Sequence, residues 1–283
     1  MSARIAVIGL VGKTIFMEVP RFHAGGETIH ATGLHEEWGG KGFNQAIAAV
    51  RQDASVSFLG AVNAADAKAL KDFCAAEGLV AILAAKKKPT ATAAILTDGT
   101  GETRVTVYPG AELEPKDVDA FAGKIAMADF LLLNNEVPEA VNLAAVAIAR
   151  QYGVKIIFNP APARKLPKAI VENVSIFTPN EFEEEGVNTD VAFLNKRRDA
   201  ASPLEVITTL GAKGCRIGST GEVVPAPAVK AVDSTGAGDT FNAVLAVRLA
   251  EGEELREACV AANEAAARSV AVKYVLPSLP RRG

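Results

Sequence analysis

Residues 233–241 read Asp-Ser-Thr-Gly-Ala-Gly-Asp-Thr-Phe, and apolar residues then recur at helical spacing, so a glycine-rich turn opens a helix here. Gly236 and Gly238 let the backbone approach a ligand closely, and the free N–H groups at the helix start attract an anion such as a phosphate. Asp239 would repel a phosphate that only had to bind, but it suits a base that takes a proton from an attacking hydroxyl. An aspartate that merely complements the helix dipole explains the segment alone equally well.

A second glycine turn enters a helix at residues 38–46, which read Trp-Gly-Gly-Lys-Gly-Phe-Asn-Gln-Ala. Lys41 and Asn44 are three residues apart, so they share one face of the helix start and can reach a single polar ligand. The glycines permit close backbone contact with a polyol. Taken alone, a glycine loop with a solvated lysine is the more ordinary interpretation.

Short apolar runs alternate along the chain with longer segments of helical periodicity. The predicted strands cover residues 4–9, 56–62, 129–133, 154–158, 174–177 and 205–209. The predicted helices cover residues 41–51, 64–77, 138–151, 236–251 and 253–272. Because such alternation is typical of a parallel sheet covered on both faces, the sequence predicts an α/β fold with a mostly parallel sheet.

Two stretches interrupt this alternation, at residues 14–34 and 90–108. In the second, Asp-Gly-Thr-Gly at residues 98–101 separates two β-type runs, as a hairpin turn would. We expect these stretches to form a small β-sheet lid over a ligand held at the carboxyl ends of the main strands. The predicted domains are a discontinuous α/β core of residues 1–12, 35–89 and 109–283, and a β lid of residues 13–34 and 90–108.

The composition argues against several classes of protein. The 283-residue chain has a formal net charge of −3 and lacks the basic excess that phosphate-backbone binding needs, so we expect no nucleic-acid partner. The first apolar stretch, residues 5–11, is too short to cross a bilayer and has no cleavage-site pattern, so we expect a cytoplasmic protein with no membrane association. The three cysteines are widely separated, which argues against a disulfide framework and a thiolate zinc site.

The two glycine segments together resemble the signature regions of the ribokinase family of carbohydrate kinases, also called the PfkB family. Further matching segments lie in the family's order at residues 24–28, 134–138, 159–163, 178–181 and 208–214, so the resemblance extends over most of the chain. It implies a ribokinase-like three-layer α/β/α core with a small β-sheet lid. It also implies an ATP-dependent phosphotransferase that moves the γ-phosphate of ATP to a hydroxyl of a small sugar.

The resemblance implies a role for each matching residue around the transferred phosphate and the sugar. Asp239 would be the catalytic base. The anion hole for the phosphate would be formed by Gly236, Ala237 and Gly238. The positions that hydrogen-bond sugar hydroxyls are matched by Gly40, Lys41, Asn44 and Glu136.

The same resemblance implies where the nucleotide and the cations bind. Asn180 and Glu183 match the family's Asn-x-x-Glu element, which acts near Mg²⁺ and the phosphates through water. The loop along the nucleotide and the adenine pocket are matched by Thr209, Gly211, Gly214 and Asn263. Parts of a monovalent-cation (K⁺) site are matched by Asp233, Thr235 and Ser278. The implied cofactors are therefore ATP, Mg²⁺ and K⁺.

The chain departs from the ribokinase pattern in the sugar site. Gly12 and Thr14 occupy the positions at which ribokinases usually carry an Asn and an Asp that bind ribose hydroxyls. Losing an ionised acceptor weakens binding by roughly 1.5–3 kcal/mol per charged hydrogen bond, so we expect that D-ribose is not the strict substrate. Tyr274 also replaces a glycine of the loop near the cation site.

Two alternatives remain open, a nucleoside or modified-nucleoside kinase of the same family and a non-catalytic sugar or nucleotide sensor. Lid strands with open edges could pair between two subunits, so a homodimer through the lid is a further prediction.

Overall fold

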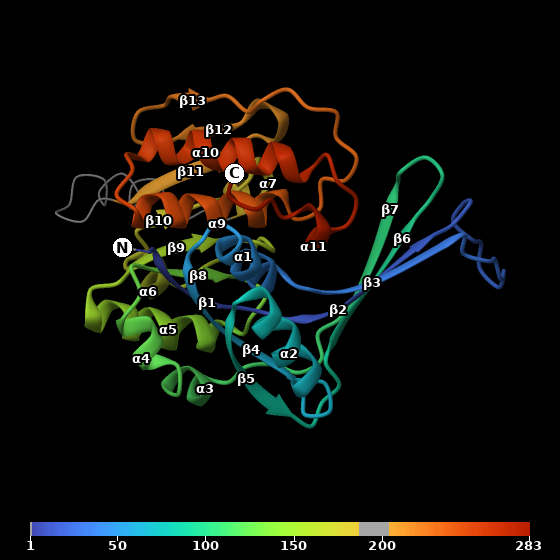
Figure 1. Ribbon diagram of the computed structural model, residues 1–283, viewed down its shortest axis with the longest axis horizontal. Coiled ribbons are helices and arrows are strands. Elements are labelled where there is room, and N and C mark those ends of the chain that lie inside the picture. Colours follow the sequence, from blue (N-terminus) through green and yellow to red (C-terminus); the bar gives the residue numbers. More distant parts are fainter. Residues whose placement is uncertain (1, 187–203) are drawn as a thin grey trace.

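The computed structural model describes residues 2–186 and 204–283, and its main element is a nine-stranded sheet (Figure 1). The strands are β1 (Arg4–Ile8), β4 (Ser55–Asn63), β5 (Val80–Lys86), β8 (Phe130–Asn134), β9 (Lys155–Asn159), β10 (Ile176–Phe177), β11 (Glu205–Thr209), β12 (Cys215–Ile217) and β13 (Val223–Val224). Their order is β13-β12-β11-β10-β9-β8-β1-β4-β5. Neighbours from β5 to β11 pair in parallel, whereas β12 and β13 pair antiparallel.

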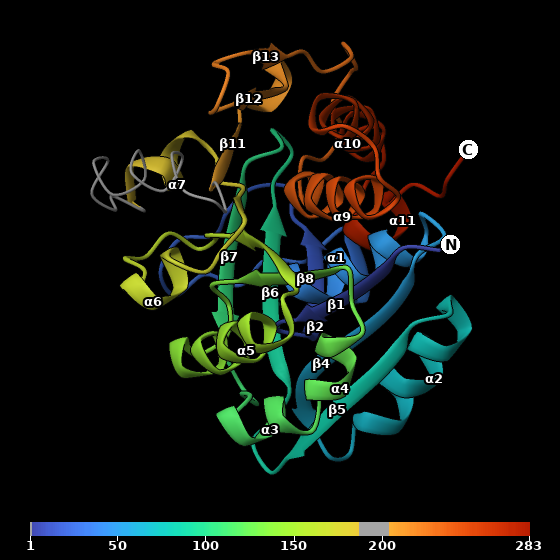
Figure 2. The same cartoon turned by 90° about the vertical axis from the view of Figure 1, so that its left-hand side faces the viewer.

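Helices cover both faces of this sheet, as Figure 2 shows. Alternate residues of β1 enter different cores: Ile5 and Val7 belong to one cluster, Ala6 and Ile8 to the other. The first cluster includes residues of α1 (Lys41–Val50), α2 (Ala67–Glu77), α9 (Ala237–Ala250), α10 (Leu255–Ser269) and α11 (Val275–Ser278). The second includes residues of α3 (Pro115–Asp119), α4 (Ala122–Ala126), α5 (Glu139–Tyr152) and α6 (Lys168–Val171). The three-layer α/β/α prediction is therefore confirmed.

A second, four-stranded sheet projects from one side of the core (Figure 1). Its order is β3-β2-β6-β7, with β2 (Gly12–Glu18), β3 (Gly33–Gly39), β6 (Ala91–Thr97) and β7 (Thr103–Tyr108). We call these four strands the lid. The predicted hairpin joins β6 to β7, and Asp98 Oδ1 accepts the backbone N–H of Thr100 at 2.8 Å and that of Glu102 at 3.1 Å.

The small sheet extends past two of the predicted domain boundaries. Gly12 is part of β2 and residues 35–39 are part of β3, although the sequence assigned them to the core. Residues 187–203 of the assigned core range lie outside the described residues. Strands β5, β12 and β13 were not predicted: β5 and β13 are the edges of the main sheet, and β12 is only three residues long.

The first turn of α1 lies at the carboxyl end of β1 and contacts the first turn of α9. A Cβ at Gly9 would lie 2.6 Å from the Cα of Gly42, so glycine lets the end of β1 pack directly on the first turn of α1. This close contact between Gly9 and Gly42 also fixes the position of the side chains in the first turn of α1. Among the described residues, no helix combines the length and hydropathy needed to cross a membrane.

Candidate active site

A cavity of about 280 Å³ lies between the two glycine turns, at the carboxyl ends of the strands. It is lined by Lys41, Asn159, Ala161, Thr178, Asn180, Glu183, Thr209, Ser234, Thr235, Gly236, Gly238, Asp239 and Asn242. The first glycine turn contributes Lys41 and the second contributes most of one wall. Segments far apart in the sequence are thus brought to one polar cavity.

Asp239 lies in the first turn of α9 and is only 6% exposed. Asn44 donates its Nδ2 hydrogen to Asp239 Oδ2 at 2.9 Å, and Gln45 donates its Nε2 hydrogen to Asp239 Oδ1 at 3.1 Å. Burial raises the pKa of Asp239, while the Lys41 charge and the two amide donors oppose that rise. Asn44 was predicted from the sequence but Gln45 was not, since its only signal is that it follows Asn44 in the same glycine segment.

The glycine turn before α9 adopts a conformation that requires glycine. Gly236 has φ +80°, and a Cβ there would lie 2.6 Å from Val275 Cγ1. A Cβ at Gly238 would meet no atom within 4 Å, since this residue borders the open cavity. Ala237 does not line the cavity, and its N–H points to Ser234 O at 3.3 Å. The N–H of Ala237 is thus engaged within the turn, and the start of α9 presents its remaining backbone donors and the positive end of the helix dipole to the cavity.

Lys41 and Glu136 are linked through the backbone of the first glycine turn. Glu136 Oε2 accepts the backbone N–H of Lys41 at 2.7 Å. Burial raises the pKa of the Glu136 carboxyl to about 7, although the positive charge of Lys41 lowers it. The pKa of Lys41 is raised by the nearby charges of Asp239, Glu136 and Glu183, against the opposing effect of its own burial, so the ammonium charge is retained.

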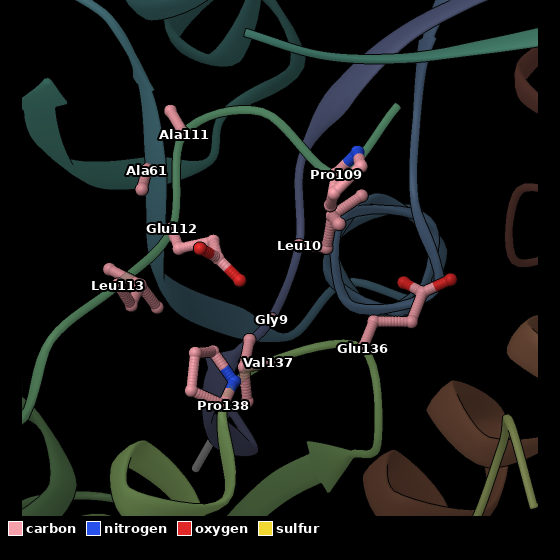
Figure 3. Close-up of a pocket in the computed structure, with 10 residues that line it drawn as sticks. All are labelled: Gly9, Leu10, Ala61, Pro109, Ala111, Glu112, Leu113, Glu136, Val137 and Pro138. Carbon is pink, nitrogen blue, oxygen red and sulfur yellow. The ribbon is translucent and has the colours of Figure 1, made fainter. Parts of the chain in front are cut away.

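A second, much smaller cavity of about 20 Å³ lies behind Glu136 (Figure 3). It is enclosed by the end of β1, the segment at residues 109–113 that leads from the lid back to the core, and residues 136–138. Figure 3 shows the carboxylate of Glu112 extending toward its centre and that of Glu136 turned away from it. This volume suits one water molecule rather than a sugar.

The other predicted sugar residues do not line the larger cavity between the two glycine turns. Thr14 is 9% exposed and packs against Gly39 of the neighbouring strand β3. Gly12 lies against β6, where a Cβ would come 2.5 Å from Ala91 O. Gly40 caps α1 with φ +112°. Asn44 does not line the cavity, but it donates a hydrogen bond to Asp239, which does.

The predicted nucleotide residues divide into two groups. Asn180 and Glu183 line the cavity and cap α7 (Glu181–Gly186) reciprocally: Asn180 N–H donates to Glu183 Oε2 at 3.0 Å, and Glu183 N–H donates to Asn180 Oδ1 at 2.7 Å. Thr209 joins them there. Gly211, Gly214 and Asn263 do not line the cavity. Asn263 is buried and donates to Val224 O at 2.9 Å, which ties α10 to β13.

The structure adds cavity residues for which no role was predicted. Asn242 lies three residues after Asp239 on the same face of α9, a spacing that could have indicated it. Its Nδ2 donates to Gly238 O at 2.8 Å, and its Oδ1 accepts the hydroxyl of Thr178. Asn159 is the last residue of β9, and Ala161 lies two residues later in the segment at residues 159–163.

The predicted cation residues surround the start of the second glycine turn. Asp233 accepts the backbone N–H of Thr235 at 2.9 Å and that of Tyr274 at 3.1 Å, and Ser278 Oγ donates to Val275 O at 2.8 Å. Within residues 2–186 and 204–283, no group of three or more His, Cys, Asp or Glu side chains could hold a metal ion. Mg²⁺ is often held mainly by water, one or two carboxylates and substrate phosphates. The carboxylate of Glu183 in the cavity fits such a site.

Comparison with known proteins identifies the relatives of this chain. The family model described as pfkB family carbohydrate kinase matches residues 2–282. A ribokinase of Haemophilus influenzae is 34% identical over 297 residues, which cover 100% of this chain and 97% of the relative. The crystal structure of ribokinase from Thermotoga maritima superposes with a TM-score of 0.86 at 32% identity, covering 99% and 97% of the two chains. Ribokinase of Arabidopsis thaliana, solved with ribose and ATP, gives a TM-score of 0.85 at 26% identity, covering 99% and 96%.

Proposed function

The chain belongs to the pfkB family of carbohydrate kinases and is an ATP-dependent carbohydrate kinase, and from that premise we propose how its own residues carry out the transfer. Asp239 is the base that takes the proton from the attacking sugar hydroxyl. The observation that carries this proposal is the position of a buried carboxylate in the cavity, beside the backbone donors that open α9. Family membership also argues against a non-catalytic sensor.

In the proposed reaction the hydroxyl oxygen of the sugar forms a bond to the γ-phosphorus of ATP, and the bond from that phosphorus to the ADP oxygen breaks. The proton passes to Asp239, and the products are a sugar phosphate and ADP. The N–H groups of the glycine turn stabilise the charge of the transferring phosphoryl group, and Lys41 adds a positive charge in the same cavity. Gly40, Lys41, Asn44 and Glu136 orient the sugar.

We assign the cation roles to the residues that border the same cavity. Glu183 and Asn180 hold Mg²⁺ through water; one oxygen of Glu183 caps α7, which leaves the other for this role. The ion supplies charge neutralisation of the ATP phosphates when it is bound. Asp233, Thr235 and Ser278 form the K⁺ site. Equal ATP binding in KCl and in NaCl, measured by calorimetry, would contradict the K⁺ assignment.

We assign the binding of the nucleotide to Thr209, Gly211, Gly214 and Asn263.

The acceptor is a small sugar. Relatives named ribokinase make D-ribose the first sugar to test. Gly12 and Thr14 favour weak binding of D-ribose, because neither supplies an ionised acceptor for its hydroxyls. Gly12 also has no room for a larger side chain beside Ala91. The prediction that D-ribose binds weakly therefore stays a prediction.

The experiment that tests this function is ADP release from Mg-ATP across pentoses, hexoses, sugar acids and nucleosides, with Asp239→Asn as the control. A strong signal from one sugar that Asp239→Asn abolishes supports the proposal. A signal confined to nucleosides supports the alternative of a nucleoside kinase. Turnover that persists in the variant contradicts the role of Asp239.

We also propose that two copies pair through their lids. β7 is an open edge, and its Val105 and Val107 are 56% and 57% exposed on the lid face that also carries Thr14. Exposed apolar side chains on one sheet face favour burial against a second copy. Sedimentation should give a dimer that Val105→Lys converts to a monomer; a monomeric wild-type protein contradicts the pairing.

A further inference from the structure

Asp239 has both of its carboxylate oxygens held by consecutive residues of α1. Asn44 donates to Oδ2 at 2.9 Å and Gln45 donates to Oδ1 at 3.1 Å. These residues precede Asp239 by 195 and 194 positions in the sequence, so the contact exists only because α1 packs against α9. Both amide side chains are buried, and neither residue lines the cavity.

Asn44 is 6% exposed, and neither its buried Oδ1 nor the buried Oε1 of Gln45 has a hydrogen-bond partner among the described residues. Gln45 is 0% exposed and does not line the cavity. A substrate in that cavity therefore does not contact Gln45, and Gln45 can affect it only through the Asp239 carboxylate, to which Gln45 donates a hydrogen bond.

We propose that Gln45 is a positioning residue for the phosphoryl transfer, which fixes the orientation of the Asp239 carboxylate and stabilises its ionised form. The proposal rests on the proposed function, in which Asp239 is the base. A hydrogen bond to one oxygen directs the other oxygen toward the cavity, where the attacking hydroxyl must donate.

The electrostatic surroundings explain why a neutral donor matters here. Lys41 of α1 is the positive group near Asp239, while Glu136 after β8 is a negative neighbour, and Glu183 of α7 lies in the same cavity. Burial already favours the protonated carboxyl, which cannot accept a proton. Because hydrogen bonds to the charged form lower a carboxyl pKa, loss of the Gln45 amide raises the pKa of Asp239 further.

The decisive variant is Gln45→Met, which keeps the length of the side chain and removes the donor. With Mg-ATP and the sugar that gives the strongest ADP release, we expect kcat to fall about tenfold with little change in either KM, because a hydrogen bond to a charged group is lost. The acidic limb of the kcat profile should move up by about one pH unit. The same shift should be seen in the substrate-free protein, in a ¹³C NMR titration of the Asp239 carboxyl that is assigned by its loss in Asp239→Asn.

Matched variants separate this role from a structural one. Gln52 is 1% exposed and donates to Pro280 O at 2.9 Å, so Gln52→Met removes a similar buried amide just beyond the other end of α1 and should leave the pH profile unchanged. In an Asp239→Asn background, Gln45→Met should cause no further loss of turnover, since it acts through the missing carboxylate.

If Gln45→Met fails to fold, Gln45→Glu gives the same test. A second carboxyl against Asp239 should raise its pKa further, so the NMR midpoint should move up by more than one unit. An unshifted midpoint in a folded variant, or an additive loss in the Asp239→Asn background, overturns the positioning role. Neither outcome tests whether Asp239 is the base, because that role is tested separately by the Asp239→Asn variant.

Discussion

His35 of the lid stacks on Tyr274 of the core, with ring centroids 3.9 Å apart and ring planes 15° from parallel. Tyr274 also donates its hydroxyl to Glu18 Oε1 of β2 at 3.2 Å. The next residue, Val275, packs against Gly236 at the start of α9. The lid is thus joined to the glycine turn that borders the cavity by one short segment of chain.

Tyr274→Gly should loosen this junction. The substitution removes the stack and suits the backbone, which has φ +67° at this residue. Because aromatic pairs contribute about 0.5–1.5 kcal/mol, we expect the sugar KM to rise about two- to tenfold. Hydrogen exchange should speed up in β2 and β3. Tyr152→Ala, at a residue that is 53% exposed, is the control. Unchanged exchange in the lid strands would show that the stack does not hold them.

Asp239→Asn should lower kcat by about 100-fold or more, the usual effect of losing a general base. The amide keeps the size of the side chain, so the affinity for ATP, measured by calorimetry, should change little. Wild-type turnover in this variant would exclude Asp239 as the base.

Lys41→Ala and Asn44→Ala should each raise the sugar KM by about tenfold, with a much smaller effect on the KM for ATP. Asn44→Ala should also lower kcat, because Asn44 donates to Asp239. Lys71→Ala, at an exposed position of α2, serves as the control in steady-state kinetics. Equal effects on both substrates would mean that the sugar lies elsewhere.

Glu136→Gln should change how stability depends on pH. The pKa of this carboxyl is raised by burial from 4.5 to about 7, so the unfolded chain releases the proton at a lower pH than the folded protein does. The stabilisation from Glu136 is therefore present below about pH 4.5 and is lost as the pH rises through about 7. In urea unfolding we expect the variant to gain roughly 3 kcal/mol relative to the wild type between pH 4.5 and 7.5. A parallel pH dependence of Glu136→Gln and wild type would contradict the burial argument.

Thr14→Asp should lower the KM for D-ribose by about tenfold, since it supplies the ionised acceptor that the position lacks. Gly12→Asn should not do so, because its Cβ would meet Ala91 O at 2.5 Å and displace β6. Steady-state kinetics of the two variants with D-ribose makes the comparison. An unchanged KM in Thr14→Asp would remove the physical basis for expecting weak ribose binding.

The sequence predicted the elements that carry strong local signals. The helices that begin at the two glycine turns were predicted at residues 41–51 and 236–251, and they are found at Lys41–Val50 and Ala237–Ala250. Helical periodicity and glycine turns depend on neighbouring residues, so they can be recognised without the fold. The edge strand β5 was missed because it is only partly buried and so lacks the continuous apolar pattern of a central strand.

The sequence by itself determined the α/β architecture, the lid hairpin and the two segments that border the cavity, because each is encoded in a local pattern. Only the tertiary structure decided which side chains meet. It placed Gln45 on Asp239, used Asn263 to tie α10 to β13, and stacked His35 on Tyr274. The physical reason is that these contacts join residues from distant parts of the chain. Their geometry is fixed by how helices pack on the sheet, which no local pattern specifies.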